Sequence, residues 1–290
     1  MPTGPVTHGK AWVEMLHRYL ATGVGGLILV LTVMAWLAWS AARGKAGSAA
    51  INPWWATLTL LWVCLQGGFG ALTVTMKLFP AIVTLHLLGA MVMLVLLAAQ
   101  VVRLQVAGGA QAVAVAPGLR RLLWVAATLL FVQISLGAWV STNYAVLACT
   151  DFPTCQGAWW PEMNFAQAFQ LWRPLGETGD GNLLSFAALT AIHYTHRAMA
   201  GVVLVLLGLA AWQLNRVPAL RPHSRWLAAL VGLQLASGLS NVVLGWPLVA
   251  ALAHTGGAAA LVLVLTWALC ASRASAAQGQ NAHNVRLESA

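Results

Sequence analysis

The chain has 290 residues, of which only 7% are charged and 60% are hydrophobic. Soluble domains carry roughly 25% charged residues, so this composition excludes a water-soluble protein of one or two domains and points to lipid as the main solvent. The net charge of +9 comes from basic residues scattered between apolar runs. It therefore does not predict nucleic-acid binding, which requires basic residues gathered on one exposed face.

Seven segments are long and apolar enough to cross a bilayer as helices, since a span needs about 20 apolar residues. In chain order they are residues 12–40, 55–76, 81–102, 121–142, 186–214, 226–246 and 250–272. Buried helices of a large soluble bundle are an alternative, but these segments lack the polar faces such helices carry. The sequence predicts an all-α polytopic membrane helix bundle with seven transmembrane helices.

The charged residues predict the orientation of these spans, because cytoplasmic loops are rich in Lys and Arg. Ten of the 15 basic residues fall on one side: Arg43, Lys45, Arg103, Arg120, Arg121, Arg216, Arg221, Arg225, Arg273 and Arg286. Five of the six acids fall on the other: Glu14, Asp151, Glu162, Glu177 and Asp180. We expect a cytoplasmic C-terminus, with the N-terminus and the loop 143–185 outside. Residues 1–11 hold neither a signal peptide nor an earlier span, so we also expect a first helix to be missing from this chain.

The two halves of the chain contain matching sequence marks, which indicates an internal repeat. The matching marks are a His-Arg pair (17–18 and 196–197), Gln-x3-Gly (66–70 and 234–238) and His-x2-Gly-Ala (86–90 and 254–258). Both Gln-to-His spacings are 20 residues. The first three spans thus align with the last three, and the span 121–142 has no partner. We predict two pseudo-symmetric parallel repeats of three and four helices.

Four histidines inside the predicted spans repeat between the halves: His17, His86, His196 and His254. Ionisable residues within membrane helices indicate function by default, although a histidine can also serve as a hydrogen-bonded link between helices. All four lie in the outer half of the bilayer at 1.5 Å per residue. Two histidines from two helices in each half suit the two axial positions of a haem iron.

Other interpretations of these spans remain open. A zinc or copper site needs three or four close ligands, often cysteines, and Cys64 and Cys270 have no nearby cysteine in the sequence. A proton relay would not require a matched pair in each half. Arg18 and Arg197, beside the histidines, could pair with haem propionates or could extend to the membrane surface.

Glu14 is the main difference between the two halves. It precedes His17 by three residues and shares its helix face, whereas the equivalent residue of the second half is His193. A carboxyl near a haem could transfer protons, so we expect chemistry in the first half and a fixed redox cofactor in the second. The alternative is that Glu14 caps its helix or forms an ion pair at the membrane interface.

Cys149 and Cys155 lie in the outer loop, on the oxidising side of the membrane. The five intervening residues, which include Pro153, can close into a disulfide. A structural staple and a redox role by thiol exchange are both consistent with this spacing. Trp159 and Trp160 follow and suit an interfacial aromatic belt.

Taken together, these motifs resemble the haem A synthase family over about residues 10–272. The resemblance rests on Glu14-x2-His17-Arg18, the His-x2-Gly-Ala and His-Arg marks, Ser141-Thr-Asn-Tyr144, and Cys149…Cys155-Gln-Gly…Trp-Trp-Pro161. The resemblance implies an oxidoreductase of the bacterial inner membrane that oxidises a methyl group of haem O to a formyl group, giving haem A for cytochrome oxidase. It implies haem b between His196 and His254, substrate haem between His17 and His86, and a catalytic Glu14. The chain departs from the family pattern in lacking the first span and the first outer loop.

These expectations divide the chain into a substrate-haem half (1–104), a cytoplasmic linker (105–119), a haem b half (120–273) and a cytoplasmic tail (274–290). Expected partners are haem O, the enzyme that produces it, membrane lipid and an electron acceptor of unknown kind. A homo-oligomer stays open. The competing functions are a di-haem b electron-transfer cytochrome and a non-catalytic haem-binding assembly protein.

Overall fold

The structure is a computed structural model that describes residues 8–42 and 52–274. Arg43, Lys45, Arg286 and the tail from residue 275 lie outside the described residues. Seven helices are long and apolar enough to cross a membrane within the described ranges. They are α1 (His8–Ala42), α2 (Trp54–Thr75), α3 (Pro80–Ala107), α4 (Pro117–Thr142), α6 (Phe186–Asn215), α7 (Arg221–Val243) and α8 (Leu248–Ala271). The prediction of an all-α membrane bundle with seven spans is confirmed.

The helix predicted at 226–246 begins and ends several residues earlier, as α7. It begins at Arg221 because Pro222 fits the first turn, where a backbone N–H is not needed. It ends at Val243 because Gly245 and Trp246 adopt left-handed backbone conformations, with φ of 67° and 64°. This turn directs the chain into α8 and places His254 in the second turn of that helix.

A small parallel strand pair joins the linker to the end of the last helix. Strand β1 (Val113–Val115) pairs with β2 (Ser272–Ala274), so Val113 lies opposite Ser272. The Arg120 guanidinium adds to this connection by donating to the backbone oxygens of Leu269 and Ser272 at the carboxyl end of α8. The sequence did not indicate these strands, and the predicted linker 105–119 is shorter, because α3 continues to Ala107 and α4 begins at Pro117.

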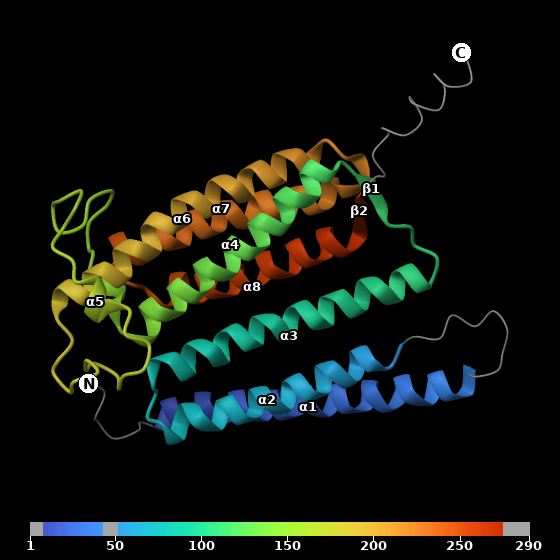
Figure 1. Cartoon of the computed structure of the whole chain (residues 1–290), viewed down its shortest axis with the longest axis horizontal. Helices are drawn as coiled ribbons and strands as arrows, with labels where there is room; N and C mark the ends of the chain where they lie inside the picture. Colours follow the sequence, from blue (N-terminus) through green and yellow to red (C-terminus); the bar gives the residue numbers. More distant parts are fainter. Residues whose placement is uncertain (1–7, 43–51, 275–290) are drawn as a thin grey trace, which may run out of the picture.

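The helices lie side by side as a bundle, with the loop 143–185, called the outer loop after its predicted side of the membrane, and its short helix α5 (Phe165–Ala168) at one end and the strand pair at the other (Figure 1). Helices α4, α6, α7 and α8 pack together as one group, α1 packs on α2, and α3 lies between α2 and the pair α4 and α8. Because α3 packs against helices on both sides, the division into three and four helices stays a prediction. The internal symmetry of the two groups stays a prediction.

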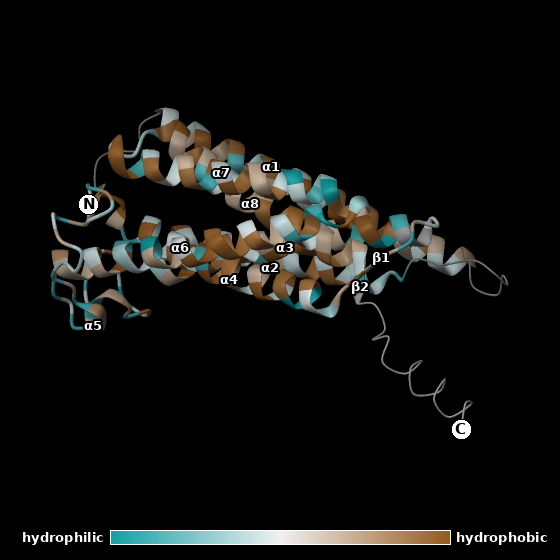
Figure 2. Cartoon of the chain, turned by 90° about the horizontal axis from the view of Figure 1, so that it is seen from above, coloured by the Kyte–Doolittle hydropathy of each residue, from teal (hydrophilic) through white to brown (hydrophobic). Residues whose placement is uncertain are grey.

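The buried core lies among the four grouped helices, in the half nearest the strand pair. Its most completely buried side chains are Leu123, Leu207, Leu214, Leu227, Leu261 and Leu265. The outward faces of the helices are apolar as well: Leu27 is 66% exposed and Val249 is 80% exposed. Hydrophobic residues cover the helical rods, whereas hydrophilic ones gather mainly toward the ends (Figure 2). This pattern is the one expected of helices whose outer faces contact lipid.

Candidate haem-binding site

A cavity of about 410 Å³ opens between α4, α6, α7 and α8 in the half of the bundle nearest the outer loops. Small residues of α4 and α6, among them Gly137, Ala138 and Gly201, line it and leave the space between the helices. Most of the wall is apolar. The polar side chains that reach it are Gln133, Ser141, His193, His196, Arg197, Gln234, Asn241, His254 and Thr255. Such a cavity, apolar with a few convergent polar groups, is typical of a ligand site.

His196 of α6 and His254 of α8 face one another across this cavity. Their ring centroids are 6.5 Å apart and their planes are inclined at 82°. Two metal–nitrogen bonds of about 2 Å each, with the two ring radii added, span roughly 6 Å. The spacing of the two imidazoles therefore fits a single metal ion between them, as in bis-histidine haem ligation.

Arg197 follows His196 on α6 and also lines the cavity. Its Nη2 donates to the backbone oxygens of Pro153 and Thr154, at 3.2 and 3.0 Å. Its Nη1 is buried and has no hydrogen-bond partner among the described residues. A buried unpaired guanidinium nitrogen is costly. This orphaned donor at a cavity wall suits the carboxylate of a ligand.

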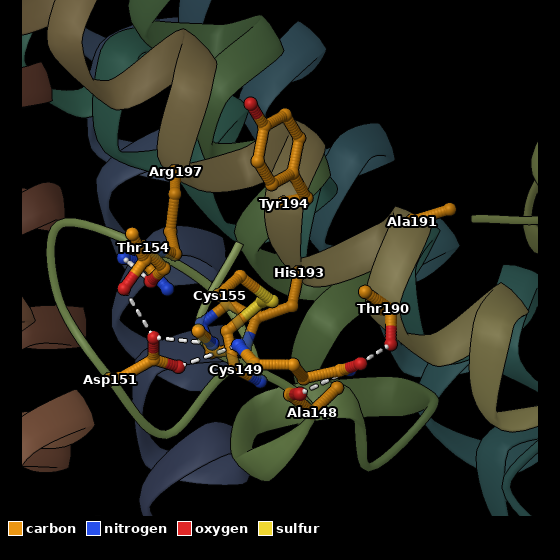
Figure 3. The surroundings of a disulfide bond; sticks show 12 residues. Ala148, Cys149, Asp151, Thr154, Cys155, Thr190, Ala191, His193, Tyr194 and Arg197 are labelled. Atoms are coloured by element: carbon orange, nitrogen blue, oxygen red, sulfur yellow. Dashed lines mark hydrogen bonds between the residues drawn. A yellow bond between two sulfur atoms is a disulfide. The ribbon is translucent and has the colours of Figure 1, made fainter. Parts of the chain in front are cut away.

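The predicted disulfide between Cys149 and Cys155 is confirmed. The loop that carries it folds over one face of α6, as Figure 3 shows. His193 accepts a hydrogen bond at Nδ1 from the backbone N–H of Cys149 at 3.2 Å, and the Tyr194 hydroxyl donates to the Trp159 oxygen at 2.8 Å. Phe152, from inside the disulfide loop, lines the cavity. The loop is thus closed by a disulfide and also forms part of the cavity wall.

Asp151 organises the tip of this loop. Its carboxylate accepts hydrogen bonds from the Thr154 hydroxyl and from the backbone N–H groups of Gln156 (2.6 Å) and Gly157 (3.0 Å) (Figure 3). These bonds, the one from Thr154 foremost, lower the pKa of Asp151 from 3.8 to about 2. The carboxylate therefore stays ionised throughout the physiological range.

Arg173 fastens the rest of the outer loop to the end of α4. Its side chain is only 1% exposed. It donates to the Asn143 side chain at 2.6 Å and to the Glu177 backbone oxygen at 3.1 Å, and it lies 5.6 Å from the Trp139 ring centroid. Burial lowers the pKa of the Arg173 guanidinium. Sequence reasoning missed this residue, because an arginine in a polar loop carries no signal of burial.

The two histidines of the first group of helices lie on α1 and α3, which both pack on α2. His17 is exposed, and His86 is half-buried with its ring against Gly70 of α2. Glu14 pairs with Arg18 at 2.7 Å on the exposed face of α1. This ion pair is the alternative that the sequence left open for Glu14. It also shows that the carboxylate and the guanidinium share one helix face with His17.

Among the described residues, neither histidine pair has a third protein ligand close to it. Within residues 8–42 and 52–274, no cluster of three or more His, Cys, Asp or Glu side chains could hold a metal ion. Cys64 is exposed and Cys270 half-buried, and both are free thiols. A closed zinc site needs four such ligands and a catalytic one three. The donor set therefore fits a metal that brings its own equatorial ligands, as haem iron does.

The fold and the site together define the class of this protein: a polytopic membrane helix bundle with a paired-histidine cavity. The family model described as "COX15-CtaA: Cytochrome oxidase assembly protein" matches residues 3–266. The chain therefore belongs to this family, which includes the haem A synthases.

Individual relatives agree with the family model. The chain is 36% identical to "Heme A synthase" of Shewanella oneidensis over 264 residues, which cover 91% of this chain and 77% of the relative. It is 27% identical over 280 residues to "Heme A synthase" of Halalkalibacterium halodurans, covering 93% and 80%. A third relative with the same name, from Symbiobacterium thermophilum, is 28% identical over 85% of this chain.

Proposed function

We propose that the chain is a haem A synthase that oxidises a methyl group of haem O to the formyl group of haem A. The observation that carries this proposal is that the ring centroids of His196 and His254 lie 6.5 Å apart across an apolar cavity. The chain that carries this pair belongs to the COX15-CtaA family. Relatives named "Heme A synthase" cover most of the chain. Haem O is the expected substrate, and haem b is the expected resident cofactor.

In the second half, we infer that His196 and His254 would hold haem b. When bound, this group supplies one-electron redox chemistry. The surrounding apolar side chains exclude water from the site, and Phe152 of the disulfide loop contributes to that wall. Arg197 already orients its Nη2 toward the loop. Its buried Nη1 is the group we assign to a haem propionate.

In the first half, we assign His17 and His86 to the substrate haem and Glu14 to proton transfer. Oxidising a methyl group to a formyl group, with the oxygen atom taken from water, releases four protons and passes four electrons to the electron acceptor, so the reaction needs a proton acceptor near the substrate. Glu14 lies one helical turn from His17. Its partner Arg18 could exchange the Glu14 carboxylate for a propionate of the incoming haem, which would leave Glu14 free to accept a proton.

We infer that the protein lies in the bacterial inner membrane with the disulfide loop outside and the C-terminus in the cytoplasm. The distribution of basic and acidic residues supports this orientation, as does the disulfide itself, because disulfides persist outside the cytoplasm. The enzyme that makes haem O, an electron acceptor and a second copy of this chain are the partners we expect.

The experiment that tests this proposal is co-expression of the full chain with a haem O supply, followed by extraction and chromatography of the pigments. We expect haem A to accumulate. A protein that binds haem b but yields no haem A would contradict the proposal and favour an electron-transfer cytochrome. A protein that binds haem O unchanged and contains no haem b would favour a non-catalytic assembly role.

A further inference from the structure

The rings of His196 and His254 each rest against a glycine of a neighbouring helix. A Cβ atom added to Gly137 of α4 would lie 2.9 Å from Cε1 of His196, and one added to Gly238 of α7 would lie 3.2 Å from Cε1 of His254. Both separations are shorter than ordinary carbon contacts. Cε1 is therefore the ring atom nearest the neighbouring helix, where any larger residue would displace the ring. In His254 the next atom is Nδ1, 3.6 Å from the added Cβ, whereas in His196 Nδ1 and Nε2 lie 3.5 and 3.6 Å away. His86 rests on Gly70 in the same way, at 3.3 Å.

Next to each glycine, a polar side chain contacts the Nδ1 atom of the histidine. The Gln133 amide nitrogen, one turn before Gly137, lies 3.0 Å from Nδ1 of His196, 3.5 Å from its Nε2 and 3.2 Å from its backbone oxygen. The Ser237 hydroxyl, adjacent to Gly238, lies 3.0 Å from Nδ1 of His254. The Ser237 hydroxyl donates its own proton to the Leu233 oxygen at 2.6 Å. Its lone pairs are therefore available to accept a proton from Nδ1.

The backbone of His254 is held as well. The Gln234 amide nitrogen donates to the His254 backbone oxygen at 2.9 Å and lies against Gly257, in the next turn of α8. On α3, the corresponding Gly89 is in contact with Gln66. The Gln-x3-Gly motif of one helix thus packs against the histidine of a neighbouring helix.

We propose that Gln133 and Ser237 are positioning residues that hold Nδ1 of His196 and His254, so that Nε2 of each ring is directed to the haem iron. This inference rests on the proposed function. A metal-bound histidine donates its other N–H to an acceptor, which fixes the tautomer and the ring orientation. Ser237 offers that acceptor as it stands. Gln133 offers it only when its amide rotates, which gives up the bond from Nε2 to the His196 backbone oxygen and turns Oε1, otherwise without a partner among the described residues, toward Nδ1.

The direction of the effect on the bound haem follows from the basicity of the ligand. A hydrogen bond accepted from Nδ1–H makes the imidazole a stronger donor, which stabilises the oxidised iron and lowers its reduction potential. Removing the acceptor should raise the potential. Replacing the amide of Gln133 by a carboxylate should lower it, because charged acceptors form stronger hydrogen bonds.

The test is a reductive titration of the haem b in the purified full chain, with Gln133→Leu, Gln133→Glu, Ser237→Ala and Ser237→Thr. We expect Gln133→Leu and Ser237→Ala to raise the potential by the equivalent of about a tenfold change in the oxidised-to-reduced ratio, or about 59 mV for one electron. Gln133→Glu should shift it in the opposite direction, and Ser237→Thr should restore the wild-type value. Ser135→Ala on α4 and Ser240→Ala on α7 are matched controls, since both hydroxyls bond only to their own helix.

A second measurement covers variants that lose haem on purification. Electron paramagnetic resonance of membranes reports the orientation of axial ligands before any purification. Gly238→Ala should change this spectrum, whereas Gly232→Ala, on the same helix with open space at its Cα, should leave it unchanged. Equal potentials in all four Gln133 and Ser237 variants, or shifts of the same sign in Gln133→Leu and Gln133→Glu, would overturn the inference. A wild-type chain without low-spin haem would overturn the proposed function and the inference with it.

Discussion

His193 accepts a hydrogen bond at Nδ1 from the backbone N–H of Cys149, 3.2 Å away, and so connects the disulfide loop to the helix that carries His196. His193 is 4% exposed and lines the same cavity as His196. The loop, the helix and the cavity are thus linked through one buried ring.

Opening the disulfide should weaken haem retention without abolishing it. In Cys155→Ser, the loop loses its covalent closure, and Phe152 and the bond from Cys149 to His193 become less well held. We expect haem to dissociate severalfold faster, as measured by transfer to an excess of apomyoglobin. Cys64→Ser is the control, because Cys64 is an exposed free thiol in the other half. An unchanged dissociation rate in Cys155→Ser would separate the loop from the haem site.

Asp151 should stabilise the loop in a pH-dependent manner. Its pKa is lowered to about 2 in the folded chain from 3.8, so its contribution is complete above pH 3.8 and is lost as the pH falls through about 2. At pH 7 we expect a phosphine reductant to cleave the Cys149–Cys155 bond severalfold faster in Asp151→Ala than in the wild type. At pH 2 the two rates should converge. A ratio of rates that does not change with pH would contradict this role.

Arg173 should be a large contributor to the stability of the outer loop. Replacing it with alanine removes two hydrogen bonds and leaves the Asn143 oxygen buried without its donor. We expect a loss of about 2–3 kcal/mol, visible as a lower unfolding temperature in detergent. Arg225→Ala, an exposed arginine on α7, should change the temperature little. Equal effects of the two substitutions would mean that the burial of Arg173 does not matter.

Glu14→Gln should separate chemistry from haem binding. Glutamine keeps the size and most of the hydrogen bonding of glutamate but cannot accept a proton at neutral pH. We expect haem A formation to fall at least a hundredfold, while the low-spin haem b spectrum stays unchanged. Arg18→Gln is the companion variant, and it should weaken substrate binding rather than the proton-transfer step. Full activity in Glu14→Gln would remove Glu14 from the mechanism.

The bundle and its histidines were predictable because their signals lie in local sequence. A span is visible as a run of apolar residues. The second copy of the repeated pattern, Gln234, Gly238 and His254, lines the cavity together with His196. The disulfide was predictable because Cys149 and Cys155 are close in the chain. The family assignment followed from several weak motifs in one order.

Other features depend on tertiary contacts that single-sequence patterns do not encode. Ser237 is one of many hydroxyls in apolar helices, and its contact with His254 depends on how α7 rotates against α8. Phe152 reaches the cavity because the whole outer loop folds back over α6. The strand pair between Val113–Val115 and Ser272–Ala274 joins segments more than 150 residues apart. Predicting any of these contacts requires knowing which segments of the chain pack against one another.

The most direct test of the central claim is the absorption spectrum of the purified full chain with His196→Ala or His254→Ala. The wild type should show the sharp bands of reduced low-spin haem b, and each substitution should remove them, because one imidazole cannot hold the iron in the six-coordinate state. His223→Ala is the control, since His223 lies against Trp267 at the other end of the bundle. Loss of the low-spin bands in both variants but not in His223→Ala is the predicted result. Low-spin bands that persist in both variants would contradict the assignment of His196 and His254.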